Sequence, residues 1–136
     1  MSPVDFVTAA RAYLGAPWRH LGRSTAGVDC IGLVLLAARQ AGVEIPDPAP
    51  YTREPDGRLL AGVRRHARRV APAADGDVLL FRLEDRAAHV GISTTHPSYG
   101  VPAVLHAYAR RGLVVEERLT EELRQAFVGA FRIAEA

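Results

Sequence analysis

Lysine is absent from this sequence, and all seventeen basic residues are arginine. Fifteen acidic residues are dispersed among them, so the formal net charge is only +2 and no strong overall field favours nucleic acid. The one dense basic run, Arg-Arg-His-Ala-Arg-Arg at 64–69, can touch an anionic polymer but is more typical of a solvated helix face. We therefore expect no nucleic-acid partner.

Cysteine occurs once, at Cys30. One thiol cannot form an intramolecular disulfide, and small oxidised secreted scaffolds usually carry several cysteines. We therefore expect packing to provide the stability of the fold. The thiol is left either for chemistry or for the core.

Long apolar runs are also missing: no segment approaches the ~18 uninterrupted apolar residues of a membrane span. The first residues, Met1 to Phe6, lack a basic region followed by an apolar stretch, so we expect no signal peptide and no membrane partner. The protein is then expected to be made and kept in the cytoplasm unless a larger particle carries it out. With 136 residues, about half of them hydrophobic, we expect a single domain over 1–136.

The first half of the chain has helical patterns separated by loops. Ser2 and Pro3 predict a helix start, and apolar residues recur at helical spacing until Gly15. Residues 16–28 are expected to form an ordered loop, and residues 30–41 a buried central helix that Gly42 closes. The prolines between Pro46 and Gly57 predict an extended surface excursion, and residues 59–70 a basic helix with an apolar inner face.

After a turn at 71–76 the hydrophobic period changes to two. Strands are expected at 77–82, 89–93, 101–108, 112–116 and 129–133, after a polar turn at 84–86. A short helix at 120–127, capped by Thr120 with Leu123 and Phe127 inward, interrupts them. Helices followed by about five antiparallel strands predict an α+β fold.

Cys30 lies where a glycine-rich, polar segment gives way to the apolar helix. Unpaired amide groups and the helix dipole at such a position favour an anion, so the pKa of the thiol is expected to be lowered towards that of a nucleophile. The backbone N–H of Cys30 would then be one donor to a developing oxyanion. The alternative is a buried cysteine acting as a small hydrophobic residue.

A nucleophilic thiol needs a base, and the base works best when a third polar group orients its ring. His89 opens a predicted strand, and His106 lies inside another, Ala-Val-Leu-His-Ala. On the residues alone, His106 can equally be a core histidine and His89 an exposed one at a strand edge. A zinc site of cysteine and histidines is a further alternative, but close paired ligand spacing is missing, so we expect neither metal nor cofactor.

Five motifs in order resemble the NlpC-type papain-like cell-wall cysteine peptidases. They cover nearly the whole chain: Tyr13-Leu14-Gly15-Ala16-Pro17-Trp18-Arg19, Gly27-Val28-Asp29-Cys30-Ile31-Gly32-Leu33, Gly76-Asp77-Val78-Leu79-Leu80-Phe81, His89-Val90-Gly91-Ile92 and Leu105-His106-Ala107. The resemblance implies a papain-like α+β fold in which the nucleophile starts a helix packed on an antiparallel sheet.

The same resemblance implies Cys30 as nucleophile, His89 as general base and His106 as the group that orients it. Trp18, His20 and Asp29 are expected beside the thiol, as substrate-binding residues or as its immediate neighbours. The implied substrate is the peptidoglycan stem peptide, cleaved between D-glutamyl and diamino acid residues.

Three positions depart from the family pattern. The usual serine after the nucleophile is Ile31, and an aromatic residue and a glycine are replaced by His20 and Leu21. The segment from Pro17 to His20, followed by Asp29-Cys30-Ile31-Gly32, resembles the branch encoded among tail genes of phages and gene transfer agents. This implies a tail-tip component with tail or baseplate partners that opens the wall locally. The alternative is a structural tail-tip or assembly protein with little or no peptidase activity.

Overall fold

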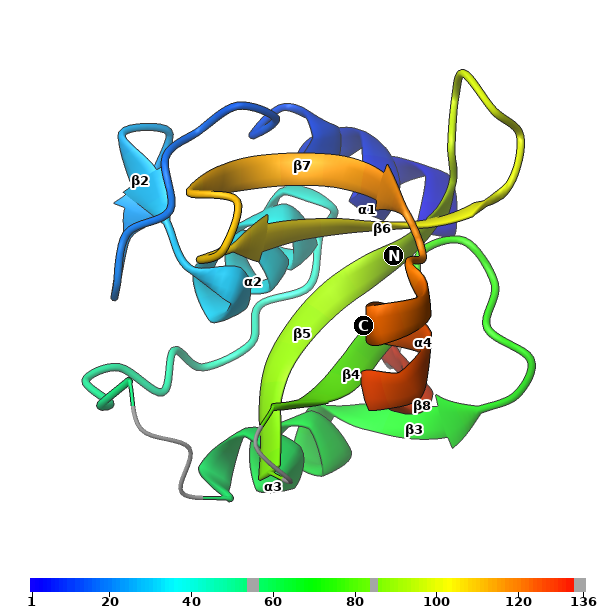
Figure 1. Ribbon diagram of the computed structural model, residues 1–136. Helices are drawn as coiled ribbons and strands as arrows, with labels where there is room; N and C mark the ends of the chain where they lie inside the picture. The colour runs from blue at the N-terminus through cyan, green and yellow to red at the C-terminus, as the bar shows by residue number, and fades with distance from the viewer. Residues whose placement is uncertain (54–56, 84–85, 134–136) are drawn as a thin grey trace.

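The computed structural model describes residues 1–53, 57–83 and 86–133, and its helices precede and flank one main sheet (Figure 1). The helices are α1 (Pro3–Arg11), α2 (Cys30–Gln40), α3 (Arg58–His66) and α4 (Glu121–Ala126). The strands are β1 (Arg23–Ser24), β2 (Gly27–Val28), β3 (Ala67–Val70), β4 (Val78–Leu83), β5 (Arg86–Thr95), β6 (Pro102–Tyr108), β7 (Leu113–Arg118) and β8 (Phe127–Ile133). The predicted α+β fold is confirmed.

Side-chain caps begin three of the helices, and the sequence predicts two of these caps. The hydroxyl of Ser2 accepts a hydrogen bond from the backbone of Asp5, and that of Thr120 accepts one from Leu123. The first helix is shorter than expected because it ends at Arg11, and turns fill the residues up to Gly15.

Over the described residues, the main sheet is antiparallel and has the order β3-β8-β4-β5-β6-β7. It contains one strand more than the expected set, namely β3. The expected loop at 16–28 also contains the small hairpin of β1 and β2. The polar turn expected at 84–86 lies mostly outside the described residues, and β5 already begins at Arg86.

The prediction of one helix over 59–70 is wrong for its last four residues. Helix α3 ends at His66, and Ala67 to Val70 pair with β8 along the edge of the sheet. Backbone pairing with a neighbouring strand here outweighs a local pattern that also fits a helix. The basic run at 64–69 therefore covers a helix end and an edge strand rather than one helix face.

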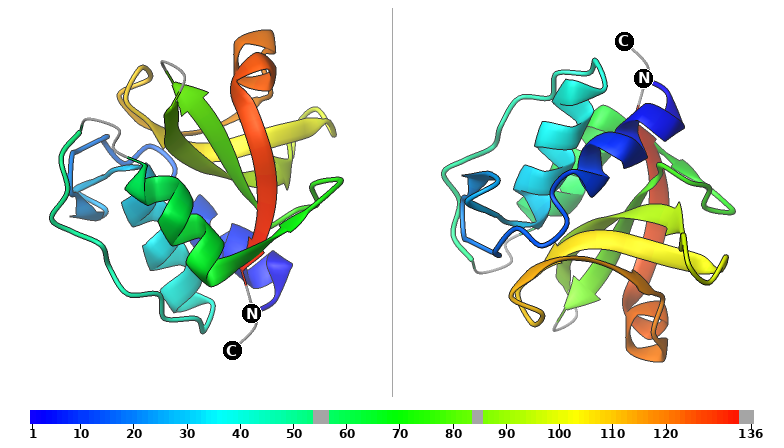
Figure 2. Two further views of the ribbon diagram at one scale, coloured as in Figure 1. Left: turned by 90° about the horizontal axis from the view of Figure 1, so that it is seen from below. Right: turned by 90° about the horizontal axis from the view of Figure 1, so that it is seen from above.

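The two faces of the sheet carry separate apolar clusters. Helices α1 and α2 pack on one face, where Phe6 and Leu33 are fully buried, and α4 lies on the other side (Figure 2). On the second face Leu123 is buried as expected, but Phe127 is 45% exposed and belongs to β8, so the prediction that it points inward is wrong. No helix among the described residues is long and apolar enough to cross a membrane.

Candidate active site

Cys30 is the first residue of α2, and Asp29 caps the helix. The Asp29 carboxylate accepts hydrogen bonds from the backbone N–H of Gly32 at 2.8 Å and of Leu21 at 2.9 Å. A Cβ atom on Gly32 would lie 2.4 Å from the carbonyl oxygen of Gly22, so glycine lets the loop approach the first helical turn. Leu21 has φ of +61°, a left-handed conformation that explains why the family pattern has glycine there.

The strands β5 and β6 separate beside this helix start. Residues 92–95 of β5 pair with residues 102–105 of β6. Before Ile92, β5 remains paired with β4, and after Leu105, β6 remains paired with β7. Helix α2 packs on both strands, and its first turn lies where they diverge (Figure 1). The Cys30 thiol is hydrogen-bonded by the backbone of Val90, which the missing strand pairing leaves available.

The two predicted histidines join the strands at the same place. Nε2 of His89 lies 2.8 Å from Nδ1 of His106, and both rings are buried. A Cβ atom on Gly91 would lie 2.4 Å from a methyl carbon of Val104 and 3.0 Å from Cβ of His106. Glycine at 91 therefore lets β6 come close enough for the two rings to meet.

Glu117 on β7 extends this pair to three side chains. Nε2 of His106 donates to its carboxylate at 2.8 Å, and Arg111 holds the other carboxylate oxygen at 2.9 Å. The hydrogen bond from His106 lowers the pKa of Glu117 to about 2, and the bond from Arg111 acts in the same direction against the effect of burial. Glu117 is not among the residues predicted from the sequence, because a strand ending in Glu-Glu-Arg is typical of an exposed edge.

Aromatic side chains pack against the two imidazole rings. Tyr108 stacks on His106 with ring centroids 4.8 Å apart and lies 4.9 Å from the ring of His89. Phe81 lies 5.8 Å from His89 on its β4 side. The sequence signal for Tyr108 is its position two residues after His106, which places both on one face of β6.

The expectation that the helix start lowers the pKa of the thiol is wrong. Burial raises the pKa of Cys30 to about 11, the Asp29 charge adds to this, and backbone hydrogen bonds from Val90 oppose it. Burial, followed by the neighbouring His106, lowers the pKa of His89 to about 3, with Glu117 opposing. Within the described residues no hydrogen bond joins Cys30 to either histidine, and the raised pKa of Cys30 and the lowered pKa of His89 favour the neutral forms of these two groups.

The other expected site residues lie around the segment that precedes Cys30. The ring of Trp18 lies under the guanidinium of Arg53 at 4.7 Å, and the ring of His20 meets that of Tyr51 edge-on at 5.7 Å. Ile31 packs against the main core and is partly exposed.

A polar cluster fastens the proline-rich excursion to this segment. The Tyr51 hydroxyl donates to Asp29 at 2.5 Å and accepts from Arg23 at 2.8 Å. Arg23 also donates to Asp29 at 2.9 Å and forms an ion pair with Asp47. The described part of the excursion therefore contacts the helix cap directly. This contact was not predicted from the sequence, where the excursion has no assigned side-chain partner.

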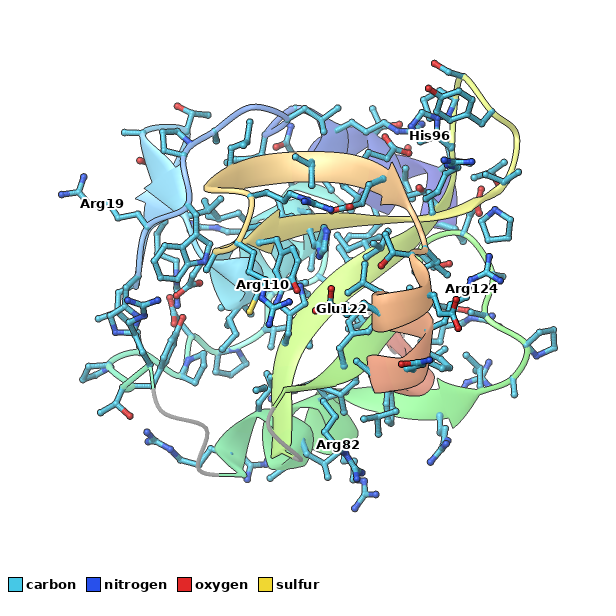
Figure 3. The ribbon with its side chains drawn as sticks, viewed as in Figure 1. Arg19, Arg82, His96, Arg110, Glu122 and Arg124 are labelled. Carbon is cyan, nitrogen blue, oxygen red and sulfur yellow. The ribbon has the colours of Figure 1, made fainter. Side chains whose placement is uncertain are left out.

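A pair of charged side chains links the turn after β6 to α4. Arg110 in that turn forms an ion pair with Glu122 of α4 (Figure 3). Both side chains are exposed. Among the described residues no three His, Cys, Asp or Glu side chains form a group that could hold a metal ion.

Comparison with known proteins identifies related domains. The family model described as the NlpC/P60 family matches residues 15–132. A probable endopeptidase of Mycobacterium tuberculosis is 34% identical over 102 residues, which cover 71% of this chain and 24% of that protein. A lipoprotein-like NLP/P60 family protein from Staphylococcus aureus matches with a TM-score of 0.73 at 20% identity over 98% of this chain and 42% of that chain.

A second solved structure, the NlpC/p60 domain of the peptidoglycan hydrolase SagA, has a TM-score of 0.65 at 20% identity, with 98% of this chain and 100% of that chain covered. The chain spans about a quarter of the length of its mycobacterial relative, 24%. The region matched by the family model contains Cys30, His89, His106 and Glu117. On this match and the shared fold, the chain belongs to the NlpC/P60 family.

Proposed function

We propose that this domain is a cysteine endopeptidase that hydrolyses peptidoglycan stem peptides. The observation that carries the proposal is the arrangement of Cys30 at the start of α2, in the gap between β5 and β6, with the hydrogen-bonded pair of His89 and His106 bridging the same two strands.

The hydrogen bond between the two histidines decides which nitrogen of His89 can act as the base. Nε2 of His89 is engaged by His106, so Nδ1 is the ring nitrogen left to take the thiol proton. The sulfur then attacks the amide carbonyl, and His89 returns the proton to the leaving amine. Water, deprotonated by His89, hydrolyses the thioester and regenerates the thiol. The N–H of Cys30, at the helix start, is one donor to the oxyanion.

The substrate assignment rests on family membership and on the charge beside the site. Two relatives are named as a probable endopeptidase and as a peptidoglycan hydrolase. The guanidinium of Arg53 over Trp18 is a cation that suits the carboxylates of a stem peptide. The motif resemblance supports cleavage between D-glutamyl and diamino acid residues.

The setting that we propose is the tail tip of a phage-like particle, which would deliver the domain to the wall. It rests on the resemblance of two segments, residues 17–20 and 29–32, to the branch encoded among tail genes. Partners would be tail-tip or baseplate proteins, and synthesis would be cytoplasmic.

The test is digestion of purified sacculi by wild type and by Cys30→Ala, with the released fragments identified by mass spectrometry. Wild type is expected to release fragments with new D-glutamyl carboxyl ends, and Cys30→Ala none, because it lacks the nucleophile. Equal melting temperatures of the two proteins serve as the folding control.

Equal inactivity of both proteins would contradict the peptidase proposal. If deletion of the protein from a particle then blocked tail assembly, the structural alternative that the changes to Ile31 and His20 suggest would take its place. New ends at another bond would retain the peptidase and overturn the D-glutamyl assignment.

A further inference from the structure

The hydrogen bonds that link His89, His106 and Glu117 determine which ring nitrogens carry a proton. A carboxylate only accepts hydrogen bonds, and the low pKa of Glu117 keeps its side chain ionised near neutral pH. The nitrogen that faces it, Nε2 of His106, must therefore carry a proton. The opposite arrangement would place two acceptor atoms 2.8 Å apart.

The proton on Nε2 of His106 also determines the direction of the next hydrogen bond, between His106 and His89. With a single proton, on Nε2, the His106 ring has an acceptor at Nδ1, so the facing Nε2 of His89 donates across the 2.8 Å contact. A neutral imidazole carries one such proton, so Nδ1 of His89 keeps its lone pair. This is the form that a base for Cys30 requires.

We propose that Glu117 is a positioning residue that sets the ring tautomer of His89 through His106. The inference rests on the proposed function and deepens it, because it names what makes the base competent. The titratable groups that contact the two rings are Glu117 of β7 and Tyr108 of β6, and Arg111 of the β6–β7 turn holds the Glu117 carboxylate.

The contact with Arg111 makes Glu117→Gln a specific test of this role. In Glu117→Gln the guanidinium requires an acceptor, so the amide oxygen turns to Arg111 and the amide NH₂ faces Nε2 of His106. Nε2 must then accept, the proton of His106 moves to Nδ1, and His89 receives a hydrogen bond at Nε2. Nδ1 of His89 becomes protonated and is unable to take the thiol proton.

Two further variants separate this effect from loss of structure. Glu116→Gln removes the neighbouring carboxylate on the opposite face of β7, where it pairs with Arg11 and accepts from Thr94. It should leave both ring tautomers unchanged. Adding Arg111→Leu to Glu117→Gln removes the group that orients the amide, so its oxygen can accept from His106 again and activity should partly recover.

The direct measurement is NMR of protein with ¹⁵N-labelled histidine, which reports the protonated ring nitrogen without any substrate. The expected result is Nε2–H for both rings in wild type and in Glu116→Gln, and Nδ1–H for both in Glu117→Gln. Peptide hydrolysis by Glu117→Gln at pH 7 should fall by about 10²- to 10⁴-fold in kcat, the scale of a misassigned tautomer in a Ser-His-Asp triad.

A wild-type spectrum with Nδ1–H on His89, or identical tautomers in wild type and Glu117→Gln, would overturn the inference. The wild-type spectrum decides the matter even if Glu117→Gln fails to fold. If the tautomers are as expected but sacculi are not cleaved, the proposed function fails and the role of Glu117 in setting the tautomer stands.

Discussion

Opposing influences act on the sulfur atom of Cys30. The helix start and the backbone of Val90 favour the thiolate, whereas burial and the Asp29 carboxylate favour the thiol, and the thiol prevails. His89 is likewise kept neutral by burial. The structure therefore supports a base that removes the thiol proton during the reaction, rather than an ion pair formed in advance.

The prevalence of the thiol form predicts how the alkylation of Cys30 depends on pH. The rate at which iodoacetamide modifies Cys30 should rise with pH towards a midpoint near the thiol pKa of about 11. His89→Ala should lower the rate at neutral pH, because the group that accepts the thiol proton is gone. Mass spectrometry of the modified protein measures both rates, with Cys30→Ala as the blank.

A rate that is already constant between about pH 5 and 8 would indicate a preformed thiolate and contradict this account. A rate that is the same in His89→Ala and in wild type would show that the imidazole does not act on the thiol.

At the scale of elements, the start of α2 depends on close backbone packing against the preceding loop. Gly32→Ala should destabilise the protein strongly, because the new Cβ would lie 2.4 Å from the carbonyl oxygen of Gly22 and 2.8 Å from an Arg23 nitrogen. We expect a loss of about 2–4 kcal/mol in the free energy of unfolding, the range of overpacked sites that cannot relax. Urea denaturation measures it.

The matched control is Gly62→Ala in α3. A Cβ atom there meets nothing within 4 Å, so alanine should raise the stability by up to about 1 kcal/mol through its higher helix propensity. If Gly32→Ala were as stable as wild type, the close approach of the loop would not be what the glycine provides.

A helix or strand can be predicted from the sequence where its local pattern favours the same structure as its tertiary contacts. Ser2 and Thr120 could be recognised as caps, and Cys30 could be placed at a helix start, because capping is a local interaction. Strand β3 was not predictable from its own residues, since only pairing with β8 makes it a strand.

The same distinction holds for the site. His89 and His106 follow from motif order, but the roles of Glu117 and Tyr51 depend on contacts between distant segments. Glu117 meets His106 across a strand pair, and Tyr51 reaches Asp29 from the proline-rich excursion. Neither contact leaves a pattern in the residues next to it.

For the whole molecule, the buried groups of the site predict how stability depends on pH. The pKa of His89 is about 3, below its ordinary value of 6.5, so between these values the unfolded chain binds more protons and stability falls as the pH falls. The lowered pKa of Glu117 adds a loss below 4.5. The raised pKa of Cys30 removes stability above 9.0.

The expected maximum therefore lies between about pH 6.5 and 9, and denaturant unfolding across the range measures it. From pH 6.5 to 4.5 wild type should lose about 2 kcal/mol more than His89→Asn, whose amide does not titrate. Parallel curves for the two proteins would mean that the ring protonates as readily in the folded protein as in the unfolded chain.

Strand β7 reads Val114-Val115-Glu116-Glu117, so each of its faces receives one valine and one glutamate. On the face towards the histidines, a slip of one residue would give nearly the same pattern, because Glu116 would take the place of Glu117 and Val114 that of Val115. On the other face the slip would put Val115 where Glu116 pairs with Arg11 and accepts from Thr94, so that face distinguishes the two registers. The backbone of residues 15–18, which bonds to Gly112 and Val114, also distinguishes them and helps to fix which carboxylate reaches the histidines.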